Sequence, residues 1–471
     1  MFTDSWTPSK RLTFWVGVGG VVVGTVAGVL AGAKPLYLGL ALGVAMVVAY
    51  FFAEFERAVL GLLVLRTALD IFSEQQIPAM FAIGVDALAL LYVTFLLLTR
   101  RTVHTDGFWW FFAGWVMLQG LWLILCALGG LGLGASVLLD NIREWIRLFS
   151  WLMVYLLVMQ LKDHTHPEKI ISLLFISLIP PVVVGLIQQF LLSSPGSETR
   201  IQGTLGHPNG FATYLLLFIG LTWWKLSWAQ RRWPWLLLLG LLANLYVSTH
   251  ALVGLAMIGV FTLVMIAPKL NLVNIISVVF LLVVVLGLFA STEFGRERLD
   301  TIANTPLLNP NIDVSRAILL AQSDGNSFNW RLVQWNFLLQ SWQKSPLFGY
   351  GLATAAYVSP FSLAAHNDYV RALVEGGIVG LVAFLTFLGA QGVRLVQLLE
   401  RAPRGSSRRD LCWVLLAIFL ATLVGMCTDN VWLFTPFYLY WWSVLAVAGW
   451  NWKELQPPKG SVLASSLQRL T

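Results

Sequence analysis

The sequence predicts an all-α polytopic membrane protein with about 12–14 transmembrane helices and one large loop on the outer face. Charged residues make up only 11% of the 471 residues and hydrophobic residues 58%, with a mean hydropathy of +0.76. Soluble proteins carry about 25% charged residues, so this chain cannot cover a water-facing surface. Its apolar runs are continuous, whereas the strands of outer-membrane barrels alternate apolar and polar residues. Soluble enzymes, disordered chains, disulfide scaffolds and membrane β-barrels are therefore excluded.

Fourteen segments are long and apolar enough to be candidate spans, since a helix crosses the hydrocarbon with about 20 residues. They cover residues 12–32, 36–53, 57–72, 77–98, 108–128, 145–161, 169–192, 210–228, 233–248, 250–267, 272–291, 369–396, 411–428 and 431–451. Arg66 interrupts the third segment, and the joint at 248–250 is short. The run at 12–32 follows Lys10 and Arg11 as a signal peptide would, but it is long for one, and a span is favoured.

The basic residues give the orientation. With the N-terminus inside, 19 of the 30 Lys and Arg residues lie on the inner side, most clearly in the short loop RAPRGSSRRD at 401–410. Both termini are then cytoplasmic. The net charge of +7 reflects these short clusters between spans and does not indicate a nucleic-acid partner.

This topology divides the chain into four parts. Residues 1–291 form a helix bundle with a short outer loop at 193–209, and residues 292–366 form an outer loop of 75 residues. C-terminal helices follow at 367–452, and a cytoplasmic tail at 453–471. Loops longer than about 15 residues are usually functional or disordered. This one contains an amphipathic helix at 330–343, suited to a membrane surface, and a glycine-rich turn at 346–357, so we expect it to fold as a lid over the bundle.

Arginines on the outer side are an anomaly for a membrane protein. They are Arg143, Arg147, Arg200, Arg316, Arg331 and Arg371. Guanidinium groups bind phosphate with bidentate geometry, so the set suggests a lipid-linked diphosphate. Alternatively, single arginines snorkel or pair with nearby acids, Arg143 with Asp140 and Arg371 with Glu375.

A motif joins the large loop to the next span. The chain reads HNDYVRALVEGGIVG at 366–380, which is His-Asn-x9-Gly-x-x-Gly. This resembles the O-antigen ligase and polymerase superfamily of the bacterial inner membrane. An arginine followed four residues later by Trp335, the turn PLFGYG at 346–351 and the segment RIQGTLGHPNG at 200–210 also resemble that family. His250 stands where many members carry an arginine.

The resemblance implies a bundle of the glycosyltransferase C type, in the inner membrane and with a periplasmic active site. It implies transfer of a glycan from undecaprenyl diphosphate to an acceptor such as lipid A-core or another glycolipid or glycan, with no metal and no cofactor. His366 and Arg331 would be catalytic, with His366 the base for the acceptor hydroxyl. Residues expected to bind the diphosphate or substrate are Arg200, Arg147, Arg143, Arg371, Asn367, His250 and Glu375. Gly377 and Gly380 would be structural glycines that allow close helix packing.

Alternative roles remain for several of these residues. His366 fits an interface residue, Asn367 and Asp368 fit helix N-caps, and His207 fits a turn. We expect Asp429-Asn430 to position an arginine or the acceptor hydroxyl. Asp86, in the middle of a span, is expected to pair with Arg66.

Alternative functions also remain. The nearest is a Wzy-type polymerase, whose acceptor is another lipid-linked glycan. A transporter or lipid flippase would place its polar residues near the bilayer midplane, whereas here they gather at one face. A scaffolding role in an envelope complex would not need the motif.

Overall fold

The computed structural model describes residues 35–162, 164–192, 200–269, 293–303, 327–359 and 361–452, with scattered positions between 276 and 291. Within these residues every regular element is helical. The α-helices are α2 (Pro35–Ala53), α3 (Phe55–Leu69), α4 (Ile77–Leu98), α5 (Gly107–Ala127), α6 (Leu138–Gln160), α7 (Pro167–Leu174), α8 (Ile179–Phe190), α9 (Pro208–Trp228), α10 (Trp233–Ser248), α11 (Leu252–Ile266), α13 (Glu293–Ala303), α15 (Ser327–Trp342), α16 (Ala355–Val358), α17 (Asp368–Arg401), α18 (Ser407–Gly425) and α19 (Thr435–Ala448). Short 3₁₀ turns are η1 (Asp70–Phe72), η2 (Gly134–Val137), η3 (Phe175–Leu178), η4 (Ala267–Lys269) and η6 (Val431–Leu433).

The predicted all-α membrane fold is confirmed. Of the fourteen predicted spans, all but those at 12–32 and 272–291 coincide with described helices. Four helices of the described chain are long and apolar enough to cross a membrane: α4, α5, the continuous stretch Pro167–Phe190 and α17. Helices α10 and α11 are apolar but shorter. The predictions for residues 12–32, Arg316 and the tail at 453–471 lie outside the described residues, and the one for 272–291 lies almost entirely outside them.

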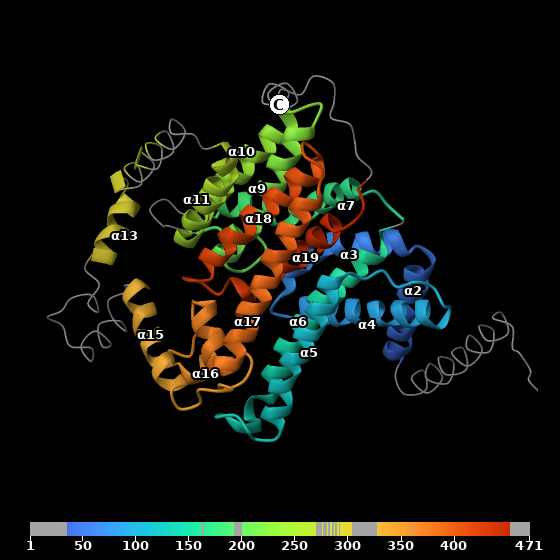
Figure 1. Ribbon diagram of the computed structural model, residues 1–471, viewed down its shortest axis with the longest axis horizontal. Coiled ribbons are helices and arrows are strands. Elements are labelled where there is room, and N and C mark those ends of the chain that lie inside the picture. Colours follow the sequence, from blue (N-terminus) through green and yellow to red (C-terminus); the bar gives the residue numbers. More distant parts are fainter. Residues whose placement is uncertain are drawn as a thin grey trace, which may run out of the picture.

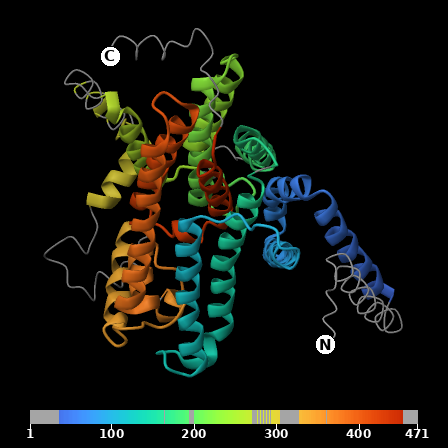
Figure 2. The ribbon, with the colours of Figure 1, turned by 45° about the vertical axis from the view of Figure 1, so that its right-hand side comes forward.

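The centre of the bundle is formed by α9 and α19, which lie between α6, α17 and α18 (Figures 1 and 2). Every residue of α19 from Phe437 to Ala448 is buried. A helix that is apolar on all sides is expected in such a position. Aromatic rings fill the space next to it, with Trp442 packed 4.7 Å from Phe112 and Trp432 packed 5.0 Å from Trp151.

Helix α17 is broken at Gly377, where φ is 65° and ψ is −164°. The two halves fold back on each other, because the rings of Tyr369 and Phe384 lie 6.1 Å apart. In a straight helix fifteen residues would span about 22 Å. The break divides the span predicted at 369–396 and leaves residues 368–376 as a short re-entrant segment beside the longer half.

The glycine-rich turn at 346–351 fills this break. Tyr350 N–H donates to Val374 O at 3.1 Å and Gly351 N–H donates to Glu375 O at 2.9 Å. In return, Ile378 N–H donates to the carbonyl of residue 346 at 2.9 Å. Backbone groups released by a broken helix must find partners within a membrane protein, and this turn supplies them.

The helix predicted at 330–343 is confirmed as α15, which lies beside α17 (Figure 1). Leu338 is buried against Val374 and Tyr350, so part of its apolar face is used for internal packing. The large loop that precedes α17 is therefore attached to the bundle over this part of its length.

Gly377→Ala should destabilise the fold by about 2 kcal/mol or more, because a left-handed φ is costly for alanine and a Cβ would collide with the backbone of Leu347. The thermal unfolding midpoint in detergent measures this. Gly389→Ala is the matched control, since that Cβ meets open space in the same helix. Equal midpoints for the two variants would contradict the proposed need for glycine at 377.

Candidate functional site

His366 ends the outer loop and lies directly before α17 in a left-handed conformation, with φ of 49°. Its backbone N–H donates to Asn430 Oδ1 at 2.8 Å, and its Nδ1 lies 3.1 Å from Asp429 Oδ1. Asn367 caps α17 by accepting from the N–H groups of Tyr369 and Val370, each at 3.0 Å. Its amide also donates to Cys427 O at 2.9 Å. The expected N-cap role of Asn367 is thus confirmed, and both ends of its amide group are engaged in the fold.

Side chains of helix α15 form hydrogen bonds with the loop segment that leads to His366. Trp335 Nε1 donates to Ala365 O at 2.7 Å, and Gln334 Nε2 donates to the carbonyls of residues 363 and 364, each at 2.8 Å. The ring of Trp330 lies 5.2 Å from the imidazole of His366, edge to face. Trp335, which follows Arg331 by four residues in the family-like pattern, therefore fixes the position of Ala365, the residue before His366.

Asp429 is the carboxylate at the centre of this arrangement and is 1% exposed. Its Oδ1 accepts from Asn430 N–H at 2.8 Å, and its Oδ2 accepts from Asn209 Nδ2. Burial alone would raise the pKa of Asp429, but the hydrogen bond and charge of His366 and the N–H of Asn430 outweigh it and lower the pKa below its ordinary value. Because an ionised carboxylate only accepts hydrogen bonds, the proton of neutral His366 resides on Nδ1, and Nε2 is the acceptor nitrogen.

Arg200 joins the same network through Asn209. Its Nη2 donates to Asn209 Oδ1 at 2.8 Å and its Nε donates to Thr249 O at 3.1 Å. His250 follows Thr249 at the joint between α10 and α11, with a φ of 48° and an exposed side chain. The short joint between α10 and α11 thus lies beside Arg200.

His207 lies next to the same network. Burial is the main cause that lowers the pKa of His207, and the nearby positive charges, Arg200 and Arg331 among them, lower it further against the opposing effect of Asp429. The ring of His207 stacks on Phe434 at 5.7 Å, and its Nδ1 is buried with no hydrogen-bond partner among the described residues. The sequence indicates only a turn at this histidine.

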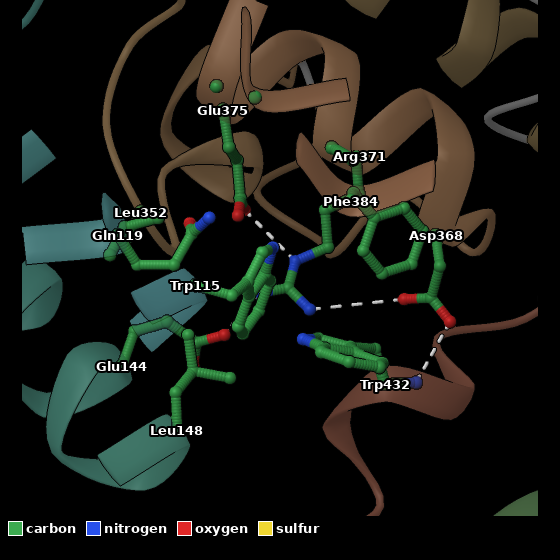
Figure 3. A pocket seen from close by; sticks show the side chains of 13 residues that line it. Trp115, Gln119, Glu144, Leu148, Leu352, Asp368, Arg371, Glu375, Phe384 and Trp432 are labelled. Carbon is green, nitrogen blue, oxygen red and sulfur yellow. Dashed lines mark hydrogen bonds and ion pairs between the residues drawn. The ribbon is translucent and has the colours of Figure 1, made fainter. Parts of the chain in front are cut away.

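A second cluster surrounds Arg371 (Figure 3). This side chain is buried, and its Nη2 donates to Glu144 Oε1 at 2.7 Å while its Nε donates to Glu375 Oε1 at 3.1 Å. Its Nη1 lies 3.9 Å from Asp368 Oδ1. The groups line a cavity of about 50 Å³, with room for a few water molecules. Three carboxylates thus neutralise Arg371, and the predicted pairing with Glu375 is confirmed.

The two arginines of α6, Arg143 and Arg147, also pair with acids. Arg147 donates through Nε to Glu144 Oε2 at 2.8 Å, and it also donates to Trp432 O. Arg143 pairs with Asp140 at 3.1 Å near the surface, as one of the two alternatives predicted. Glu144 therefore serves Arg147 and Arg371 together and connects α6 to α17.

Asp368 links the two clusters. Its Oδ2 accepts from Trp432 N–H at 2.8 Å, and its own N–H donates to Met426 O at 2.8 Å. These bonds hold the segment that carries Asp429 and Asn430. The Arg371 cluster is therefore a support for the His366 site.

The predicted pairing of Asp86 with Arg66 is wrong. Arg66 binds Asp70, four residues later on the same helical turn. Asp86 instead accepts from Ser150 Oγ at 2.6 Å. Asp70 is the carboxylate nearest to Arg66 in sequence and lies just past the end of α3. It can therefore pair with Arg66 locally, whereas Asp86 would have to reach from another helix.

Within the described part of the chain, no group of three or more His, Cys, Asp or Glu side chains is arranged to hold a metal ion. Metal-independent chemistry stays a prediction. The Arg371 cluster has three carboxylates, but the guanidinium occupies the space between them.

Residues 234–385 match the family model described as O-antigen ligase. This part of the chain, about a third of its length, is thus similar to the O-antigen ligase family, as the motif indicates. The match contains Arg331, His366 and the glycines at 377 and 380, and it does not reach Arg200 or Asp429. No curated protein matches the chain significantly.

Asp429→Asn should destabilise the fold at neutral pH by about 2 kcal/mol, because it removes a buried charged hydrogen-bond acceptor. The folded pKa of Asp429 is below its ordinary value of 3.8, so the unfolded chain binds the proton more tightly. The stabilisation is complete above that value and is lost as the pH falls through the folded pKa. Unfolding midpoints at several pH values check this: the gap between wild type and variant should narrow in acid, and a constant gap would contradict it.

Proposed function

We propose that this protein is an O-antigen ligase-type glycosyltransferase. It moves a glycan from undecaprenyl diphosphate to a hydroxyl of lipid A-core or a similar acceptor at the periplasmic face of the bacterial inner membrane. The observation that carries this proposal is the hydrogen bond between His366 and the buried Asp429, whose network reaches Arg200 through Asn209, in a chain that matches the O-antigen ligase family model over residues 234–385. Metal and cofactor are not required in this scheme.

The reaction needs a base and a means to stabilise the leaving group. The acceptor oxygen attacks the anomeric carbon of the donor sugar and gives its proton to His366 Nε2. The bond between that carbon and the diphosphate oxygen breaks, and its electron pair leaves with undecaprenyl diphosphate. Guanidinium groups stabilise the negative charge that develops on the diphosphate.

His366 is suited to be the base. Asp429 holds Nδ1 and so leaves Nε2 for the acceptor, as second carboxylates do in other histidine-dependent sites. The imidazolium that forms after proton transfer is stabilised by the same carboxylate. The hydrogen bond that the backbone N–H of His366 donates to Asn430 Oδ1 fixes the position of the residue.

Arg200 and Arg331 are the proposed diphosphate ligands. Arg200 is exposed and Arg331 is partly exposed, so an incoming donor can reach both. Arg371 is buried among carboxylates, and Arg147 is held by Glu144, so we assign these two, with Glu375, to positioning. Substrate contacts for Arg143 and His250, which are exposed, stay predictions.

A transfer assay with purified protein and lipid-linked glycan tests the function. Lipid A-core is added in one reaction and omitted in the other. A single conjugate that forms only with lipid A-core supports a ligase. Longer lipid-linked glycan without added acceptor would show a polymerase, and no transfer in either reaction would refute the proposal.

His366→Ala should lower the transfer rate by about 10²- to 10⁴-fold, because the reaction loses its base. The variant should still fold and insert into the membrane, with a lower unfolding midpoint because Asp429 loses one of its hydrogen-bond partners. His164→Ala, at an exposed histidine of a loop predicted to face the cytoplasm, is the matched control and should transfer at the wild-type rate. A His366→Ala variant with normal transfer would remove the catalytic assignment.

Arg331→Ala should raise the KM for the donor and lower kcat, with a loss of about 10²- to 10³-fold in kcat/KM. Arg331→Lys should restore little, because an ammonium cannot make the bidentate contact. Lys344→Ala, an exposed cation shortly after α15, should leave the donor KM unchanged. Full recovery by the lysine variant would show that charge alone is needed at this position.

A further inference from the structure

A large cavity lies at the end of the bundle away from His366. Its volume is about 780 Å³, and it is lined by the ends of α9, α11 and α17 and the first turns of α18. α18 runs from this cavity to the neighbourhood of Asp429, and its 19 residues span about 28 Å. The cavity is therefore separate from the site described above, and it lies at the end that carries the basic loop 401–410 (Figure 2, top).

The walls of the cavity are apolar. Trp223, Phe261 and Met265 are among the lining residues, and Trp223 is about half exposed, at 47%. In a membrane protein such an opening between helices faces lipid. A volume of this size lies within the range of small-molecule sites, about 300–1,000 Å³.

The polar groups of the cavity are mainly hydrogen-bond donors. Arg404 is exposed at its rim, and Arg409 is fixed there by bonds from Nη1 to Leu399 O at 2.9 Å and Ala402 O at 3.3 Å. Trp413 Nε1 is buried with no hydrogen-bond partner among the described residues, although a buried indole N–H usually has one. The acid of the lining, Asp410, accepts from Trp228 Nε1 at 2.9 Å.

We propose that this cavity binds an anionic phospholipid of the leaflet next to the 401–410 loop. The phosphate would meet Arg404, Arg409 and the Trp413 N–H, and an acyl chain would lie along the tryptophan and methionine walls. Charge complementarity selects an anionic headgroup, and the apolar walls select a lipid over a soluble anion. Basic pockets between transmembrane helices at the cytoplasmic side recognise anionic lipids in this way. The lipid would hold α9, α11 and α18 together at the end remote from the reaction.

Native mass spectrometry of the full-length protein in detergent tests this with added phosphatidylglycerol or phosphatidylcholine of the same chains. Wild type should bind phosphatidylglycerol more tightly than phosphatidylcholine. Arg404→Gln should weaken phosphatidylglycerol binding by about fivefold, the typical contribution of one basic residue to an anionic lipid. Arg401→Gln, in the same exposed loop but outside the cavity, is the matched control and should bind as wild type does.

Two further variants separate the site from general surface charge. Trp413→Phe removes the N–H donor together with part of the ring and should also weaken binding, while Thr262→Trp should obstruct the cavity and abolish it. Equal binding of the two lipids, or equal losses at 401 and 404, would overturn the proposal. Inorganic phosphate that competes as well as the lipid would show an anion site without a lipid, which also overturns it. The readout is binding, so it is independent of glycan transfer.

Discussion

The buried carboxylate of Asp429 is the interaction on which the site depends. It accepts hydrogen bonds from Asn209 at the start of α9 and from Asn430 beside it, and it faces His366 at the start of α17. Three segments that are distant in sequence are fixed relative to each other by one charged group. An unpaired buried charge is very unfavourable, so this carboxylate is stable only when its donors are in place. The arrangement of donors around Asp429 therefore fixes the geometry of His366 as well as the packing of the helices.

The fold supports this carboxylate through a second buried network. Arg371 contacts acids from α6 and α17, and Asp368 accepts a hydrogen bond from the backbone N–H of Trp432. Buried ion networks of this kind add little net stability over an apolar core, but the loss of one member is strongly destabilising. In this protein the network fixes the positions of the side chains and of the segment that carries Asp429. The break at Gly377 also contributes, since it separates the short first segment of α17, whose Arg371 and Glu375 line one pocket with Glu144 (Figure 3).

Much of this architecture could be predicted because its signals are local. Hydropathy predicts nearly all the described helices, and the spacing from His366 to Gly377 and Gly380 predicts the family that residues 234–385 match. The pairing of His366 with Asp429 was not predictable, because 63 residues separate the two and no local pattern connects them. The bond between Asn209 and Asp429 joins residues 220 positions apart. The fold-back in α17 also escapes hydropathy, since residues on both sides of Gly377 are apolar whether the helix continues or reverses.

The outer arginines illustrate the same limit. Sequence places them on one face and so predicts a single anion-binding set, but burial divides them. Arg371 and Arg147 are close to acids of the same or a neighbouring helix and contribute to the interior, whereas Arg200 and Arg331 are accessible. The arginines predicted for the outer face thus fall into two groups. Arg147 and Arg371 hold the carboxylates that shape the site, whereas Arg200 and Arg331 have side chains that solvent can reach. The proposed transferase would need both groups, because a leaving diphosphate must be released after reaction, and fully exposed cations alone would bind it without orienting the base.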